Sequence, residues 1–83
     1  MEHIARTAKQ AAAAIRRERR QQAMTQSQLG KKIGVRQATI SRLETGEEAT
    51  SLQTLLDTLT ALNLELVIRP RTKASSRDIE DIF

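Results

Sequence analysis

Residues 24–46 constrain the fold more than any other part of this 83-residue chain. They contain two short segments with apolar residues at helical spacing, separated by a glycine and a valine. Leu29 and Ile33 lie one turn apart in the first segment. Ile40 and Leu43 lie three residues apart in the second. The pattern predicts two short helices joined by a tight turn, each with one buried side.

Capping residues mark the ends of these two helices. Thr25 and Gln28 have the spacing of a capping box, in which the threonine hydroxyl accepts an amide of the first turn and the glutamine returns to the cap. Gly34 is expected to end the first helix, because glycine adopts the left-handed conformation without strain. The second helix is predicted from about residue 36 to residue 45, with Gly46 ending it.

Two more helices are predicted around this pair. Residues 5–22 have Ala and Ile at helical spacing (Ala8, Ala11, Ala12 and Ile15). Residues 52–62 carry an apolar stripe of leucines that we expect in the core (Leu52, Leu55, Leu56, Leu59 and Leu62). Thr50 or Ser51 would cap this helix, and Asn63 would end it. An all-α domain of four to five helices is expected over residues 1–70.

Residues 64–70 predict one short β-strand that ends at Pro70. No second strand is found in the chain, so the strand is expected to pair with its copy in a homodimer. Its apolar residues exceed what one small core can use, and part of them is assigned to the dimer interface (Leu64, Leu66, Val67 and Ile68). Residues 71–83 are polar, with mixed charge, and predict a disordered tail.

Charge is concentrated on the half of the chain that holds the central helices. Residues 1–46 carry ten Lys and Arg against three Asp and Glu, whereas residues 47–70 carry one against four and residues 71–83 three against three. The net charge of +4 therefore hides a strongly basic N-terminal half, as expected of a surface that binds a polyanion. Phe83 is the only aromatic residue, which argues against base stacking as the mode of binding.

The second central helix has the side chains needed to read DNA base edges. Gln grips adenine, Arg grips guanine, Ala touches a thymine methyl group, and Ser serves either role. The outward positions of this helix offer that set, which we predict to contact bases (Arg36, Gln37, Ala38, Ser41 and Arg42). No acidic residue interrupts this face before Glu44.

Backbone phosphates are expected beside this helix. Gln26 opens the first central helix, where free amides and a polar side chain can hold an anion. The remaining predicted phosphate contacts are Thr25, Lys31, Lys32 and Thr39. For the two lysines, ordinary solvated charge is an equally good explanation.

The pattern of residues 25–46 resembles the Xre/Cro/phage-repressor helix-turn-helix family, whose domain is similar to that of lambda repressor. The resemblance covers residues 11–63 and rests on Thr25-Gln26, Leu29, Ile33-Gly34-Val35, Gln37-Ala38-Thr39-Ile40-Ser41, Leu43-Glu44 and Gly46. It implies a structural ion pair between Arg19 and Glu44. It also implies a repressor that reads a palindromic operator as a homodimer.

A narrower resemblance is to HipB-type antitoxins. Residues 37–41, the leucine-rich helix, the Asn-Leu-Glu-Leu segment and the loose tail carry it. It implies dimer pairing through the strand, repression of the protein's own operon and binding of a HipA-like kinase toxin. Three positions depart from the pattern: Ala23 and Gly30 replace Gly and Ala, and Phe83 stands where such tails end in Trp.

Other function classes are disfavoured. The chain lacks cysteine, metal-ligand spacing and a glycine-rich phosphate loop, so no metal, cofactor or enzymatic activity is expected. His3, the lone histidine, lies at the N-terminus away from any carboxylate pair. A membrane-surface or protein-interaction module would need bulkier apolar anchors than the first helix offers. A cytoplasmic bacterial protein, nucleoid-associated when bound to DNA, is expected, and a free-standing operon regulator without a toxin is the alternative.

Overall fold

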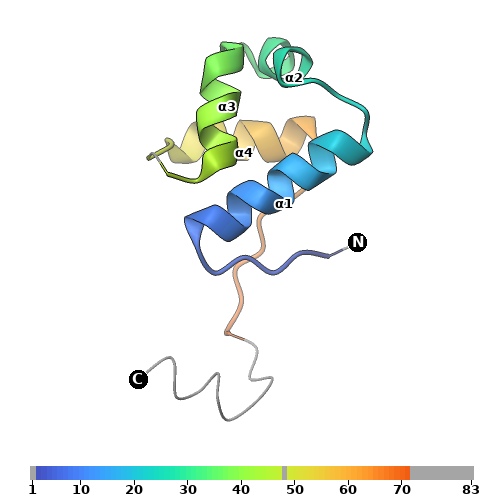
Figure 1. Cartoon of the computed structure of the whole chain (residues 1–83). Coiled ribbons are helices and arrows are strands. Elements are labelled where there is room, and N and C mark those ends of the chain that lie inside the picture. The colour runs from blue at the N-terminus through green and yellow to red at the C-terminus, as the bar shows by residue number, and fades with distance from the viewer. Residues whose placement is uncertain (1, 48, 72–83) are drawn as a thin grey trace.

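The computed structural model describes residues 2–47 and 49–71. Within them the chain forms four helices, α1 (Ala8–Gln21), α2 (Gln26–Ile33), α3 (Gln37–Thr45) and α4 (Leu52–Ala61) (Figure 1). The expected all-α architecture is confirmed, although α1 begins three residues later than predicted. The predicted disordered tail lies outside the described residues except for its first position.

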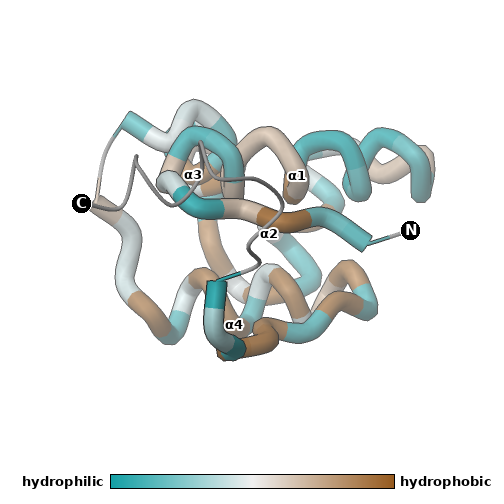
Figure 2. Tube along the Cα trace, turned by 90° about the horizontal axis from the view of Figure 1, so that it is seen from below, coloured by the Kyte–Doolittle hydropathy of each residue, from teal (hydrophilic) through white to brown (hydrophobic). Residues whose placement is uncertain are grey.

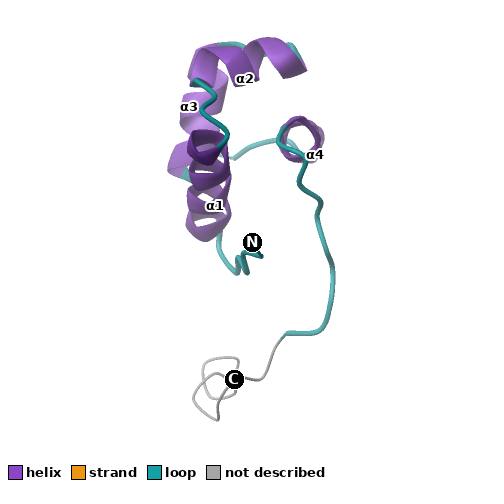
Figure 3. Cartoon of the chain, turned by 90° about the vertical axis from the view of Figure 1, so that its right-hand side faces the viewer, coloured by secondary structure: helices purple, strands orange, loops and turns teal. Residues whose placement is uncertain are grey.

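The helices enclose one small core. Figure 3 shows α1 and α3 on one side of the molecule, α4 on the other, and α2 across one end. Every helix or its flank contributes to the buried centre (Ile15, Leu29, Ile40, Leu43 and Leu62). Partly buried side chains surround that centre (Met24, Ile33, Val35, Leu55, Leu59, Ala61 and Leu64). The core thus fixes α3 against both α1 and α2.

Side-chain caps begin three of the helices. The capping box at α2 is complete, since Thr25 Oγ1 accepts from the Gln28 amide at 3.0 Å and Gln28 Oε1 accepts from the Thr25 amide at 2.8 Å. Ser51, one of the two predicted candidates, caps α4 by accepting from the Thr54 amide at 3.1 Å. Thr7 caps α1. Gly34 ends α2 with a φ of 78°, as expected.

Two helix junctions use non-glycine residues in the left-handed region. Ala23, which replaces a glycine of the family pattern, has a φ of 54°, and Asn63 after α4 has a φ of 58°. Asparagine tolerates this conformation, whereas alanine is strained by roughly 1–2 kcal/mol. The turn between α1 and α2 therefore retains the backbone that glycine would favour.

Gly30 has a packing reason that the sequence does not reveal. A Cβ atom placed on it would lie 2.7 Å from the Val35 carbonyl oxygen, which belongs to the turn between α2 and α3. The Val35 amide in turn donates to the Gly30 carbonyl at 2.8 Å. The missing side chain lets the turn fold tightly onto α2, so this glycine is part of the turn geometry.

One expectation for the C-terminal part stays a prediction and another is wrong. The single chain forms no strand within residues 64–71, so a strand that pairs with a second copy is unconfirmed, and the segment that follows α4 leads away from the helices (Figure 3). Not all leucines of α4 enter the core, because Leu52 is 64% exposed and Leu56 is 36% exposed. The stripe facing the core is narrower than predicted, since α4 packs against few neighbours, and Thr58 takes a fully buried place in it.

Candidate DNA-binding surface

Helix α3 presents a slim polar face opposite its buried side. Gln37, Ala38 and Arg42 are exposed and Ser41 is half-buried, while Ile40 and Leu43 lie in the core. Arg36, the residue before the helix, is also exposed and makes no side-chain cap. All five residues predicted to contact bases are thus at or near the surface, on or just before one helix (Arg36, Gln37, Ala38, Ser41 and Arg42).

An ion pair fixes the C-terminal end of α3 to α1. Arg19 Nε donates to Glu44 Oε2 at 2.6 Å, and Arg19 Nη2 donates to Glu44 Oε1 at 3.0 Å. Both side chains are buried, and Arg19 Nη1 also donates to the Met24 carbonyl at 2.8 Å. The hydrogen bond to Glu44 raises the pKa of Arg19 above its usual value, although burial acts in the opposite direction. The guanidinium is therefore permanently charged and bridges α1, α3 and the turn before α2.

The same carboxylate extends the network to the start of α2. Gln26 Nε2 donates to Glu44 Oε1 at 3.1 Å, and Gln37 Nε2 donates to Gln26 Oε1 at 2.6 Å. The chain of hydrogen bonds connects both ends of α3 through the first residue of α2. Each amide nitrogen carries two hydrogens, so Gln26 and Gln37 each keep one donor for another ligand. The two hydrogen bonds thereby hold the side chains of Gln26 and Gln37 in place beside α3.

The other predicted phosphate contacts lie on α2, on the residue before it and on α3. Thr25, next to Gln26, is exposed, and its hydroxyl hydrogen is available because the oxygen serves as the acceptor in the cap. Lys31 is exposed, whereas Lys32 Nζ lies 3.3 Å from the Ala61 carbonyl oxygen at the end of α4. Lys32 thus lies toward α4 and away from α3. Thr39 is half-buried in the first turn of α3.

The residues predicted for the dimer interface divide into two groups. Leu64 packs against the core of its own chain. Leu66, Val67 and Ile68 are 52%, 65% and 92% exposed. Figure 2 colours several residues of α4 and of the segment that follows it as hydrophobic. The exposed Leu52 and Leu56 add apolar surface that sequence reasoning had placed in the core.

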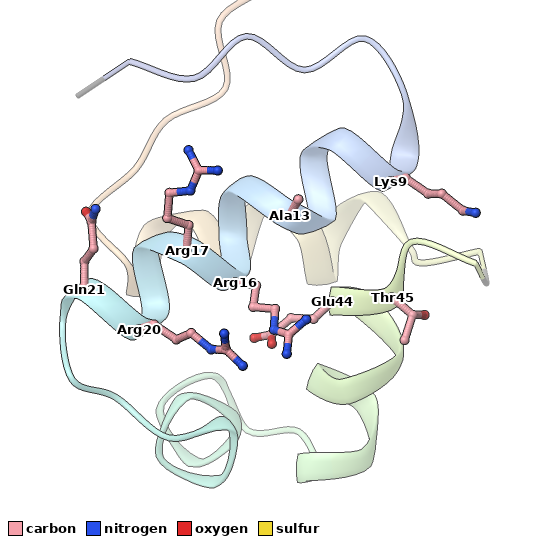
Figure 4. A pocket seen from close by; sticks show the side chains of 8 residues that line it. All are labelled: Lys9, Ala13, Arg16, Arg17, Arg20, Gln21, Glu44 and Thr45. Atoms are coloured by element: carbon pink, nitrogen blue, oxygen red, sulfur yellow. The ribbon is translucent and has the colours of Figure 1, made fainter.

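Sequence reasoning also missed a second basic surface. A hollow of about 570 Å³ lies between α1 and the end of α3, lined by Lys9, Ala13, Arg16, Arg17, Arg20, Gln21, Glu44 and Thr45 (Figure 4). The basic run in the sequence predicted positive charge but not its position beside α3. In the described residues, no cluster of His, Cys, Asp and Glu could hold a metal ion. No described helix has the length and hydrophobicity needed to cross a membrane.

Residues 15–68 match the model of a helix-turn-helix family, HTH_3. The chain belongs to this helix-turn-helix family. The resemblance inferred from residues 25–46 is confirmed, and the matched span contains the whole of α2, α3 and α4. The helix-turn-helix unit itself is α2, the turn at Gly34, and α3.

Curated relatives narrow the likeness further. The chain is 41% identical to antitoxin HipB of Escherichia coli O6:H1 strain CFT073 over 71 residues, which cover 86% of this chain and 76% of the relative. It is 39% identical to antitoxin HipB of Escherichia coli K12 over 71 residues, which cover 86% and 81%. The narrower resemblance to HipB-type antitoxins is therefore confirmed.

Solved structures show the same helix-turn-helix fold. A complex of a HipB variant with an O2 20mer superimposes with a TM-score of 0.80 at 33% identity, covering 87% of this chain and all of the other. A HipA–HipB–O2–O3 complex gives a TM-score of 0.79 at 35% identity, covering 86% and 100%.

Proposed function

We propose that this chain is a HipB-like antitoxin that represses its own operon by binding a palindromic DNA operator as a homodimer. The observation that carries the proposal is the face of α3, where Gln37 is held by Gln26 and Gln26 by Glu44. A preorganised amide loses little entropy when it grips a base edge. Similarity to HipB chains solved with O2 and O4 20mers supports the same assignment.

In this function α3 enters the major groove, and the residues predicted to contact bases are Arg36, Gln37, Ala38, Ser41 and Arg42. The start of α2 would hold a backbone phosphate through Gln26, Thr25 and the free amides of the first turn. Lys31 and Thr39 would add phosphate contacts. Lys32 is the weakest of the predicted contacts, because its ammonium group lies at the end of α4.

The dimer is proposed to form through residues 64–70. The extended segment exposes Leu66, Val67 and Ile68, and pairing with a second copy would cover them and satisfy the backbone amides of the segment. Two copies related by a two-fold axis would then place their α3 helices about 34 Å apart, one turn of DNA. Residues 1–70 would form the DNA-binding and dimerisation domain.

The toxin partner is proposed to be a HipA-like kinase. The support is similarity to antitoxin HipB and to the HipB chain of a HipA–HipB–O2–O3 complex. A cytoplasmic location and a non-enzymatic role follow from this assignment. Co-purification with the kinase encoded beside it would support the antitoxin, whereas operator binding without any kinase partner would favour a free-standing regulator.

Binding to the DNA upstream of its own gene tests the main proposal. Gln37→Ala and Arg36→Ala should each weaken operator binding by about 1–3 kcal/mol and relax one base position in a footprint. Gln53→Ala is the matched control, because Gln53 lies on α4 and hydrogen-bonds Asp57 at 2.8 Å, away from α3. If Gln37→Ala and Arg36→Ala both keep the operator preference of the unmodified protein, the assignment of the reading face is wrong.

Sedimentation tests the dimer separately. The double variant Val67→Glu, Ile68→Glu should be a folded monomer at micromolar concentration, because the charges would be buried only in the pair. Both side chains are exposed in the single chain, so the helical fold should persist. An unmodified protein that sediments as a monomer in dilute solution would contradict the dimer.

A further inference from the structure

The basic side of α1 is a second charged surface that the helix-turn-helix unit does not include. Lys9, Arg16, Arg17 and Arg20 are exposed and line the hollow between α1 and the last residues of α3. Ala13, which also lines the hollow, carries only a methyl group as its side chain. Four of the eight residues that line the surface are therefore cationic, and its one acidic residue is Glu44.

These cations have no acidic partner in the described residues. The one carboxylate that lines the hollow, Glu44, is buried and already paired with Arg19 through two hydrogen bonds. None of the ion pairs in the described part of the chain involves Lys9, Arg16 or Arg20. Like charges this close together repel one another, so the surface is best stabilised by an external anion.

The position of the cations makes that anion a neighbour of the α3 face. Figures 1 and 3 place α1 and α3 on the same side of the molecule, with α4 behind them. In Figure 4 the side chains of Arg16 and Arg20 extend toward Glu44 and α2, whereas Arg17 extends to the other side of α1. The hollow also includes Thr45, the last residue of α3. The basic surface is therefore continuous with the C-terminal end of α3.

We propose that Arg16 and Arg20, assisted by Lys9, bind phosphates of the DNA backbone beside the groove that α3 enters. This proposal rests on the proposed function, to which it adds a clamp on the backbone separate from the start of α2. Residues 9–20 extend over about 16 Å of helix, a length along which one strand of B-DNA presents about five phosphates. A membrane surface fits less well, because the hollow contains no bulky apolar anchor.

The test compares the salt dependence of DNA binding between single variants. Arg16→Gln and Arg20→Gln each remove one charge and keep good helix propensity. Arg17→Gln is the matched control, since it removes the same charge from the same helix. Arg17 borders the hollow, but its side chain extends to the other side of α1, away from Glu44. The probes are the duplex from upstream of the gene and a shuffled duplex of equal length, titrated at several salt concentrations.

Loss of one phosphate contact should lower the log–log salt slope by about 0.9 and the affinity about fivefold near 0.15 M salt. We expect this for Arg16→Gln and Arg20→Gln, equally on both duplexes, and an unchanged slope for Arg17→Gln. The clamp would be overturned if Arg16→Gln and Arg20→Gln left the salt slope unchanged, or if Arg17→Gln lowered it equally. Either result would leave the proposed function intact as long as the unmodified protein prefers its operator. An unmodified protein without operator preference would overturn the proposed function and the clamp together.

Discussion

Glu44→Ala is the substitution that most directly tests how α3 is held in place. The carboxylate accepts from Arg19 Nε at 2.6 Å, from Arg19 Nη2 at 3.0 Å and from Gln26 Nε2 at 3.1 Å. Its removal leaves the guanidinium of Arg19 buried, with the Met24 carbonyl as its remaining hydrogen-bond acceptor. The variant therefore creates a buried charge without a counter-ion.

The expected magnitude is large for a chain of this size. Removing one partner of a buried ion pair costs about 3–5 kcal/mol, because the remaining charge stays desolvated. An 83-residue protein has a total free energy of unfolding of about 4–12 kcal/mol on the usual scale of 0.05–0.15 kcal/mol per residue. Glu44→Ala should thus remove about a quarter of the stability or more. It should also release Gln26 and, through it, Gln37.

Urea unfolding followed by circular dichroism measures the effect, at one fixed protein concentration because a dimer's stability depends on it. Glu47→Ala is the matched control, since Glu47 is exposed just beyond α3 and should change stability by less than about 0.5 kcal/mol. The double variant Arg19→Met, Glu44→Leu should recover most of the loss, because no charge is left buried. A loss below about 1 kcal/mol for Glu44→Ala would refute the reasoning, since the pair would then behave like an exposed one.

Three further predictions concern the turns and the lysines. Gly30→Ala should destabilise the protein by about 1–3 kcal/mol in thermal unfolding despite the better helix propensity of alanine, because the Cβ would lie 2.7 Å from the Val35 carbonyl oxygen; higher stability would contradict the close approach. Ala23→Gly should stabilise it by roughly 0.5–1 kcal/mol, since the strain at φ 54° outweighs the entropy that glycine adds to the unfolded chain; a loss of stability would argue against a left-handed residue there. Lys31→Gln should lower the salt slope of DNA binding more than Lys32→Gln, because the ammonium of Lys32 lies at the Ala61 carbonyl; equal slopes would place both lysines on the DNA.

Local patterns were sufficient to predict the helix-turn-helix unit. The capping box of Thr25 and the left-handed Gly34 each depend on residues that lie within about four positions along the chain. Both features can therefore be recognised in the sequence. The apolar spacing of Leu29, Ile33 and Ile40 likewise identifies the buried side of each helix without knowledge of its neighbour. Helix ends and helix faces were therefore largely predictable.

Packing between distant segments was not predictable in the same way. The leucines of α4 have equal hydrophobicity, and only the arrangement of the helices in space leaves Leu52 and Leu56 exposed. Gly30 looked like a weak point of α2 until the close approach of the Val35 carbonyl gave it a role. In both cases the cause is a neighbour in space that no local pattern specifies.

The sequence alone determined the helices, their caps and the set of polar residues on α3, because each depends on short-range spacing. The tertiary structure decided how those residues are held. The path from Arg19 through Glu44 and Gln26 to Gln37 joins residues from three helices. It also decided that the arginines of α1 lie beside α3. Such juxtapositions depend on how the core orients the helices, and a linear pattern contains no information on crossing angles between them.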